Sequence, residues 1–286
     1  MIDGRTRIFG VLGDPISHSL SPAMHNAAFS DLDINAVYLP FHVKAQELGN
    51  AVAGIRAMNV TGVNVTVPHK EKIMIFLDEV DADAQIIGAV NTVVNQEGKL
   101  TGFNTDSLGF LRSLQTDLNF DPRNKKVLVL GAGGACRAIL TALSRSQTAW
   151  IGVVDIVIEK AEALATEFSG KFPGTQFAWF CCEPAQVTGI FAEIDLLVNA
   201  TPIGLKGEKF EGINWQQLPP TACIYDIVYA FPATPLVQSV RDRGYRAADG
   251  LGMLIAQGEE AFFLWNGKWP PEGSMRKGIS SLVQRE

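Results

Sequence analysis

The chain has 286 residues, so at about 150 residues per domain it predicts two domains of moderate size and excludes a small scaffold held together by disulfides. Apolar residues make up 47% and charged residues 19%, a composition that supplies a large core and excludes a disordered chain. The formal net charge is −6, whereas a surface that binds the phosphate backbone of a nucleic acid is positively charged. We therefore expect no nucleic-acid partner.

Short β-rich runs alternate with helical patterns along the whole chain, which is typical of a parallel sheet with crossover helices. The predicted strands are residues 8–12, 37–41, 60–67, 127–130, 151–154, 196–200 and 224–227. Between them, apolar residues recur with the helical period, as in the stripes that begin at Leu48 and Ala161. The sequence therefore predicts an α/β fold.

A polar segment follows the first predicted strand and leads into a helix. It reads GDPISHSLSP from residue 13 to residue 22, with Ser21 placed to cap the helix and Pro22 in its first turn. Hydroxyl groups such as those of Ser19 and Ser21 at a helix N-terminus suit a carboxylate ligand. Taken alone, the segment is more typical of capping and turn chemistry.

The strand predicted around residues 63–67 carries polar residues on one face. Alternation places Asn64 and Thr66 opposite three valines, and Pro68 ends the strand before Lys70. Ligands of α/β sheets bind at the carboxyl ends of strands, so Asn64 and Thr66 are candidate ligand contacts. Lys70 by itself is more typical of a solvated surface.

Three polar residues elsewhere stand out against apolar surroundings. Asn91 interrupts the apolar run 86–94, and Asp106 precedes a helix predicted from residue 107 to residue 118. Each also has an ordinary explanation as a turn residue or a helix cap. Gln257 lies on the apolar stripe of a helix predicted at residues 253–265, where a polar side chain needs a partner.

A glycine turn after the strand 127–130 indicates a nucleotide site. The turn consists of Gly131, Ala132, Gly133, Gly134 and Ala135. A strand, a glycine turn and a helix in this order let the backbone approach a pyrophosphate at the helix N-terminus. Cys136 occupies the sixth fingerprint position, where glycine or alanine is usual, so a tight turn without a ligand is the alternative.

Asp155 ends the next predicted strand, 24 residues after Gly131, which is near the spacing of the acid that receives the adenosine ribose hydroxyls. A carboxylate there repels the 2′-phosphate of NADP, and Ile156 and Val157 offer no cation to bind that phosphate. The sequence therefore favours NAD as the cofactor and leaves NADP open.

Targeting and metal signals are missing from the sequence. No apolar run approaches the roughly 18 residues of a membrane span, and no apolar segment of a secretory signal follows residues 1–7. We therefore expect a cytoplasmic protein with no membrane partner. The four cysteines form no CxxC pair and the four histidines lack ligand spacing, so we expect free thiols and no metal.

Taken together, these segments resemble the shikimate dehydrogenase family, which includes quinate/shikimate dehydrogenases. The blocks that carry the resemblance run in order from residue 13 to residue 265: GDPISHSLSPAMHN, GVNVTVPHK, GAVNTV, GFNTDSLGF, GAGGACRA, NATPIG, YDIVY and DGLGMLIAQGEEAFFLW. Such a series is far more specific than any single motif.

The resemblance implies two α/β domains separated by a cleft. Residues 1–106 and 249–286 would form an N-terminal substrate-binding (catalytic) domain, and residues 107–248 a Rossmann-type NAD(P)-binding domain. The implied reaction is reversible hydride transfer between NAD(P)H and 3-dehydroshikimate, which gives shikimate. This would make the protein an oxidoreductase of the shikimate pathway, in aromatic amino acid biosynthesis, that acts on a ring CH–OH group.

The resemblance also implies roles for individual residues. Lys70 would donate and accept the proton, and Asp106 would flank the same hydroxyl. The substrate would be bound by Ser19, Ser21, Asn64, Thr66, Asn91, Tyr229 and Gln257, with the two serines on its carboxylate. The cofactor would be bound by the glycine turn from Gly131 to Ala135 and by Asp155, Thr201, Ile227 and Gly250.

The sequence departs from the family pattern in two places. Asp155, Ile156 and Val157 stand where biosynthetic members carry an Asn-Arg-Thr type triplet, and residues 230–232 read AFP where Asn-Pro is usual. We favour shikimate as the substrate. The alternatives are an NAD-dependent dual quinate/shikimate dehydrogenase, a non-catalytic sensor of these compounds, and a dehydrogenase of another small hydroxy acid.

Overall fold

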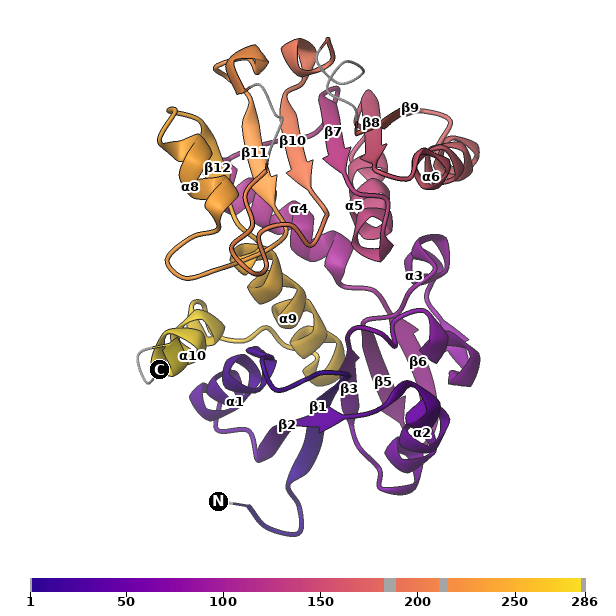
Figure 1. The fold of residues 1–286 in the computed structure, drawn as a ribbon. Coiled ribbons are helices and arrows are strands. Elements are labelled where there is room, and N and C mark those ends of the chain that lie inside the picture. Colours follow the sequence, from indigo (N-terminus) through magenta and orange to yellow (C-terminus); the bar gives the residue numbers. More distant parts are fainter. Residues whose placement is uncertain (1, 183–188, 211–214, 284–286) are drawn as a thin grey trace. The chain divides into compact units, whose positions relative to one another are not determined.

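A computed structural model describes residues 2–182, 189–210 and 215–283 (Figure 1). The chain divides into two compact units. The first consists of Met1–Thr105 and Ile255–Glu286, and the second consists of Asp106–Leu254. Each unit contains a six-stranded sheet with helices packed against it, which confirms the predicted α/β class. No helix in the described part of the chain has both the length and the apolar character needed to cross a membrane.

The first unit is built around a mixed sheet with the strand order β2-β1-β3-β5-β6-β4. Its elements are β1 (Arg7–Gly13), α1 (Ser21–Asp31), β2 (Ala36–His42), η1 (Ala45–Glu47), α2 (Leu48–Ala57), β3 (Gly62–Val65), η2 (Lys72–Phe76), β4 (Glu79–Val80), α3 (Ala82–Ile87), β5 (Thr92–Gln96) and β6 (Lys99–Phe103). The helices α9 (Leu251–Asn266) and α10 (Ser274–Val283) follow at the end of the chain.

The expectation of a wholly parallel sheet is wrong for this unit. Strand β5 runs antiparallel to both β3 and β6. The β5–β6 connection consists of Glu97 and Gly98, both with positive φ (54° and 90°), which is the backbone that a two-residue hairpin requires. Strand β3 is also shorter than predicted, because it ends at Val65 and leaves the Val67 side chain 67% exposed.

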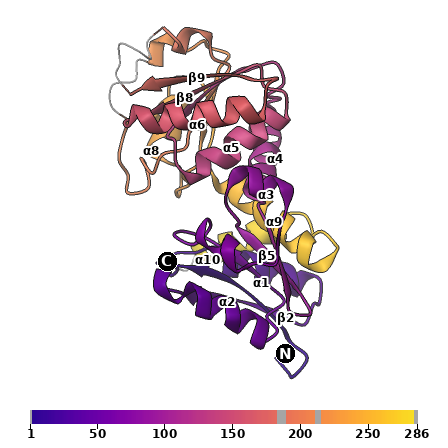
Figure 2. The ribbon, with the colours of Figure 1, turned by 90° about the vertical axis from the view of Figure 1, so that its right-hand side faces the viewer.

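Both faces of the first sheet are covered. Helix α2 packs on one face through Leu48, Val52 and Ile55 in a cluster of buried apolar residues. On the other face Phe9 of β1 contacts Phe29 of α1 and Trp265 of α9, with ring centroids 5.0 and 5.2 Å apart. The two ribbon views show α1 and α9 on the side of this sheet opposite α2 (Figure 2).

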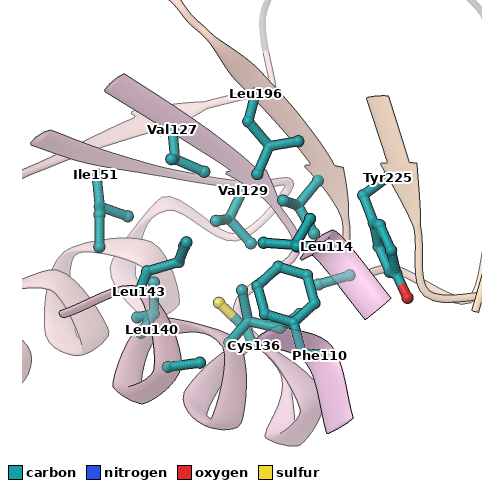
Figure 3. Close-up of a cluster of buried hydrophobic side chains, with 14 of the residues drawn as sticks. Phe110, Leu114, Val127, Val129, Cys136, Leu140, Leu143, Ile151, Leu196 and Tyr225 are labelled. Carbon is teal, nitrogen blue, oxygen red and sulfur yellow. The ribbon is translucent and has the colours of Figure 1, made fainter. Parts of the chain in front are cut away.

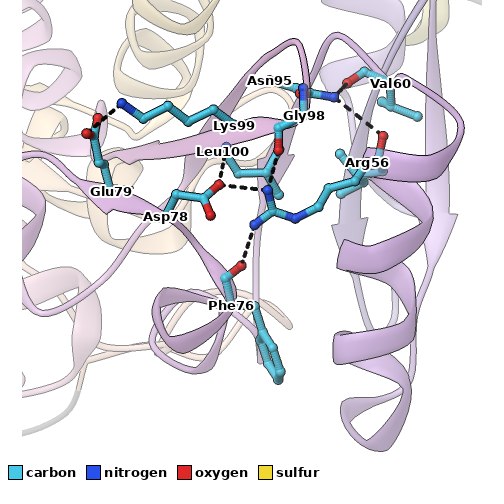
Figure 4. Close-up of polar contacts among 10 residues, drawn as sticks. Arg56, Val60, Phe76, Asp78, Glu79, Asn95, Gly98, Lys99 and Leu100 are labelled. Carbon is cyan, nitrogen blue, oxygen red and sulfur yellow. Dashed lines mark hydrogen bonds and ion pairs between the residues drawn. The ribbon is translucent and has the colours of Figure 1, made fainter.

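A polar cluster fastens α2 to the strands at the far edge of the sheet (Figure 4). The Arg56 guanidinium donates to Asp78 (2.7 Å), to the Phe76 carbonyl (3.2 Å) and to the Gly98 carbonyl. Asp78 also accepts from the Leu100 amide at 2.6 Å, and these contacts hold its pKa below the ordinary value. Since these groups satisfy one another, we assign the cluster a structural role.

The second unit contains a wholly parallel sheet with the strand order β12-β11-β10-β7-β8-β9, which is the order of a doubly wound dinucleotide-binding fold. Its elements are α4 (Asp106–Leu118), β7 (Lys126–Leu130), α5 (Gly134–Arg145), β8 (Trp150–Asp155), α6 (Ile158–Lys171), β9 (Gln176–Cys181), η3 (Phe191–Glu193), β10 (Leu196–Asn199), η4 (Trp215–Gln217), β11 (Cys223–Asp226), α8 (Pro235–Arg241) and β12 (Arg246–Ala248).

Strand alternation builds two cores in this unit. Val127 and Val129 face the cluster formed with α4, α5 and α6 (Figure 3). Leu128 faces a second cluster that includes Leu236 of α8. A parallel sheet buried on both faces requires such continuous apolar strands. Polar side chains of neighbouring strands therefore come together at the carboxyl ends of the strands, where ligands of such sheets bind.

Candidate active site

The glycine turn lies at the carboxyl end of β7, where Gly131 has a φ of +99°. A Cβ atom at Gly131 would lie 2.9 Å from the Ala200 carbonyl oxygen, so both the backbone angle and the space require glycine. Gly133 is the N-cap of α5, and residues 133–135 are exposed, with open space beside Gly133. The first amides of α5 can therefore be reached by an anionic ligand.

Asp155 is joined directly to this turn. Its two carboxylate oxygens accept from the Ala132 amide at 2.8 Å and from the Val157 amide at 2.9 Å. The structure therefore brings the predicted ribose acid to the glycine turn. Cys136, at the position usually occupied by glycine or alanine, is fully buried in the core, and burial raises the pKa of its thiol. It serves as a small apolar side chain.

A buried carboxylate organises the loop that carries Thr201. Asp226, at the end of β11, accepts from Asn199 (2.7 Å), Thr234 (2.7 Å) and the Val228 amide (3.1 Å). Asn199 in turn accepts from the amide and the hydroxyl of Thr201, at 2.9 and 2.6 Å. Burial raises the pKa of Asp226, and the hydrogen bonds oppose that shift. The network fixes Thr201 at the carboxyl edge of the sheet.

Ile227 and Gly250 lie against each other at the same edge. A Cβ atom at Gly250 would come within 2.0 Å of the Ile227 carbonyl oxygen, and the Gly250 amide donates to the Val228 carbonyl at 3.0 Å. A Cβ atom at Gly131 would likewise lie 3.0 Å from the Thr201 Cγ2 atom, so Gly131 and Thr201 lie against each other. The second unit therefore brings the predicted cofactor residues to one sheet edge.

In the first unit, Ser19 and Ser21 lie where β1 leads into α1. The helix begins at Ser21 with Leu20 at the N-cap, so the expectation that Ser21 is the cap residue is wrong. Instead, the Ser19 hydroxyl oxygen accepts from the Ser21 amide at 3.3 Å. The two serines thus lie beside each other at the N-terminus of α1, where the N-cap residue Leu20 makes no side-chain capping bond.

The amides of Asn64 and Asn91 belong to one buried network. The Asn64 side chain donates to the Thr92 hydroxyl at 3.0 Å and to the Asn91 carbonyl at 3.2 Å. The Asn91 side-chain oxygen accepts from Thr92 at 3.0 Å and from the Thr105 amide at 2.9 Å. Thr66, just beyond β3, donates its amide to the Leu12 carbonyl at 2.9 Å. These contacts fix the amides of Asn64 and Asn91, and they also fix Thr105, the residue before Asp106.

The backbone around Lys70 is held firmly. The buried His69 ring contacts the Val43 carbonyl at 2.6 Å, and the Lys70 carbonyl accepts from the Val90 amide at 2.8 Å. Asp106 is the first residue of α4 in the second unit. Gln257 is half-buried on α9 in the first unit, and Tyr229 is half-buried in the second unit. Burial raises the pKa of Tyr229.

The Tyr38 hydroxyl also joins the network of the first unit, since it donates to Asn64 at 2.7 Å. Sequence reasoning missed Tyr38 and the other partners in these networks: Thr92, Thr105, Asn199, Asp226 and Thr234. Asn199 and Asp226 lie inside the motifs NATPIG and YDIVY, and their positions at strand ends are a usable signal. Tyr38 carries no such signal, because an aromatic residue in the middle of a strand is typical of a core.

Comparison with known proteins agrees with this arrangement. Residues 11–93 match the shikimate dehydrogenase substrate binding domain, and residues 250–277 match the shikimate 5'-dehydrogenase C-terminal domain. The chain is 44% identical over 287 residues to the shikimate dehydrogenase (NADP(+)) of Geobacter metallireducens, with 99% of each chain covered.

Several solved structures of similar proteins contain a bound substrate or cofactor. Shikimate 5-dehydrogenase from Listeria monocytogenes, in complex with shikimate and NAD, is 35% identical, with a TM-score of 0.89 and coverage of 99% of this chain and 98% of that one. Quinate dehydrogenase from Corynebacterium glutamicum, in complex with NAD, is 30% identical, with a TM-score of 0.87 and coverage of 96% and 99%. The resemblance predicted from the motifs is therefore confirmed, and this chain belongs to the shikimate dehydrogenase family.

Proposed function

We propose that the protein catalyses reversible hydride transfer between shikimate and a nicotinamide dinucleotide. The observation that carries this proposal is the buried network that joins Asn64, Asn91 and Thr105. It fixes two amides suited to ring hydroxyls and also Thr105, the residue before Asp106. High identity to a named shikimate dehydrogenase over the whole chain supports the same substrate class.

In this proposal one domain binds the substrate and the other binds the cofactor. Residues 1–106 and 249–286 bind the substrate, with Ser19 and Ser21 on its carboxylate. Asn64, Thr66, Asn91, Tyr229 and Gln257 line the rest of the ring. Residues 107–248 bind the cofactor at the glycine turn, where exposed helix amides suit the pyrophosphate.

Lys70 and Asp106 handle the proton in this proposal. Oxidation removes a hydride from the carbinol carbon and a proton from its oxygen, so a base must lie at that oxygen. In the reductive direction Lys70 donates the proton to the ketone oxygen, and Asp106 orients the lysine and the substrate. The dinucleotide supplies the hydride chemistry, and the protein supplies position and the proton.

NAD is the cofactor that the described residues favour. The Asp155 carboxylate is held at the turn by two amides, and the exposed Ile156 and Val157 follow it. No cation occupies these positions to bind a 2′-phosphate, and the carboxylate repels one. The Geobacter metallireducens relative is named for NADP(+), so measuring kcat/KM with both cofactors is the direct test. A strong preference for NADP would refute this assignment.

The second candidate is dual activity on quinate and shikimate. Likeness to a quinate dehydrogenase solved with NAD favours it, together with Asp155. Rates for both substrates, followed by absorbance of the reduced nicotinamide, separate the two activities. Turnover of either substrate also excludes a non-catalytic sensor.

Substitution of the proton-transfer pair tests the mechanism. Lys70→Ala and Asp106→Ala should each lower kcat by roughly 10²- to 10⁴-fold, because general acid–base catalysis contributes about that much. Binding of NADH, measured by fluorescence, should stay within about twofold of wild type. Full turnover in both variants would contradict the assignment. Thr234→Ser, which keeps the hydroxyl that donates to Asp226, is the control that shows how far expression and purification of a variant alone change kcat.

A further inference from the structure

Tyr38 on β2 is a buried residue next to the proposed substrate groups. Its ring is stacked on His25 of α1, with centroids 4.4 Å apart and planes 7° apart, and Trp265 of α9 lies 6.2 Å away. Only 1% of Tyr38 is exposed. The ring is thus clamped between α1 and α9, and its hydroxyl is held at one position.

The Tyr38 hydroxyl points at Asn64. It donates to the Asn64 Oδ1 atom at 2.7 Å, and the Ser21 side chain lies beside the same phenol. Burial raises the pKa of Tyr38 well above its ordinary value, so the phenol keeps its proton and stays a donor. One neutral hydroxyl therefore stands between a proposed carboxylate contact and a proposed ring contact.

The hydrogen-bonding capacity of Asn64 is almost used up by the protein. An asparagine amide has two N–H donors and two acceptor positions on its oxygen. Both donors are used, by the Asn91 carbonyl and the Thr92 hydroxyl, and one acceptor position is used by Tyr38. The capacity left on Asn64 is one acceptor position on Oδ1.

His25 does not compete for that position. Neither of its ring nitrogens makes a hydrogen bond, and burial lowers the pKa of His25 to about 3, although the nearby Asn64 side chain offsets part of that shift. The ring is therefore neutral at physiological pH and acts as a flat support for Tyr38.

We propose that Tyr38 is a positioning residue that sets substrate specificity by fixing the orientation of the Asn64 amide. Because Tyr38 fixes Oδ1 in place, the second acceptor position of Oδ1 accepts a hydrogen bond from a substrate hydroxyl. A substituent that cannot donate a hydrogen bond is then disfavoured at this position. Without the Tyr38 hydroxyl, the amide loses one of the three hydrogen bonds that fix its orientation and keeps only its two donor contacts, so this selectivity weakens. The inference rests on the proposed function, because it takes a polyhydroxylated ring acid as the ligand.

The test combines Tyr38→Phe with shikimate analogues in which each ring hydroxyl except the one that is oxidised is replaced in turn by fluorine, which is of similar size but cannot donate. In wild type, one analogue should be about tenfold worse than shikimate in kcat/KM, the loss expected for one hydrogen bond. In Tyr38→Phe, kcat/KM for shikimate itself should fall about tenfold, and the penalty for that analogue should shrink. The KM for the cofactor should be unchanged.

Tyr225→Phe is the matched control. Tyr225 is equally buried, and its hydroxyl contacts Ser113 at 2.7 Å in the second unit, so the substitution removes the same group without touching Asn64. Thermal melting of both variants shows that they fold, and calorimetric binding of the analogues gives the same ratios when turnover is slow. Unchanged ratios in Tyr38→Phe, or equal changes in Tyr225→Phe, overturn the inference. A wild-type protein that neither oxidises nor binds shikimate refutes the proposed function as well.

Discussion

At the scale of single residues, the position after Asp155 offers a direct test of cofactor choice. Ile156 is 80% exposed, so an arginine there costs the core nothing. Arginine binds phosphate through paired hydrogen bonds and offsets the repulsion from Asp155. We expect Ile156→Arg to raise kcat/KM for NADP about tenfold, with little change in KM for shikimate. Steady-state kinetics with each cofactor measures the effect.

The control for this substitution is Ile2→Arg. Ile2 is 76% exposed in the first unit, so it repeats the same change in charge at a similar exposure. Equal gains in both variants would mean that overall charge, rather than the position after Asp155, controls NADP use.

Residues whose role follows from a local motif were predicted from the sequence, and residues that act through distant partners were not. Asp155 and the glycine turn follow from spacing, and the structure does join them through the Ala132 amide. The partners of Asn64 did not follow, because Tyr38 is 26 residues away in sequence and meets Asn64 only through strand pairing. Hydrogen bonds between distant strands leave no local pattern.

At the scale of elements, an ion-pair cluster joins α5 to α6 behind the glycine turn. Glu167 accepts from both terminal nitrogens of Arg137 (2.9 and 2.6 Å) and from Lys171 (2.6 Å), and these contacts lower its pKa to about 2. A lowered pKa means that the cluster stabilises the fold above pH 4.5, the ordinary value, and loses that effect as the pH falls toward 2.

We therefore expect Glu167→Gln to lower the free energy of unfolding at pH 7. The side chain is 37% exposed, so after allowance for solvent screening the loss is less than about 1 kcal/mol. The difference from wild type should shrink steadily below pH 4.5. Urea unfolding at several pH values measures it. Glu193→Gln, which breaks a pair with Lys126 in which Glu193 is 66% exposed, should have a smaller effect, and an equal effect would contradict the argument.

The strands that sequence patterns missed are those with weak local signals. Strand β12 has three residues, and β9 has a side-chain pattern that is only partly buried. The β5–β6 hairpin was hidden because only the start of β5 lies in the apolar run 86–94, and β6 reads KLTGF, a short strand with two polar residues. The long helices α4 and α9 were predicted to within a few residues because helical periodicity sums over several turns.

At the scale of the whole molecule, the first unit is discontinuous in sequence and the second is not. Phe262 and Trp265 of α9 complete the aromatic core that covers Phe9 and Phe29. A chain that stops at residue 254 should therefore lose the fold of the first unit, because one face of its sheet is uncovered. The contiguous second unit keeps both of its cores.

Hydrogen exchange measured by mass spectrometry tests this expectation. In a chain truncated after residue 254, peptides from residues 1–105 should exchange as an unfolded chain does, while peptides from β7, β8 and β10 stay protected. The full chain, measured in parallel, provides the reference. Native protection of β1 and β3 in the truncated chain would show that α9 and α10 are dispensable.

The hydrogen bond from the Trp265 indole to the Val93 carbonyl, at 3.0 Å, joins residues 172 positions apart. During synthesis on the ribosome, Val93 emerges long before Trp265 exists, whereas every residue of the second unit is made in one stretch. The second unit can therefore fold while the chain is still growing, and the first must wait for the last helices. Until α9 is made, the apolar face of the first sheet around Phe9 stays uncovered and accessible to chaperones. The position of α9 at the end of the sequence therefore determines that the first unit folds last.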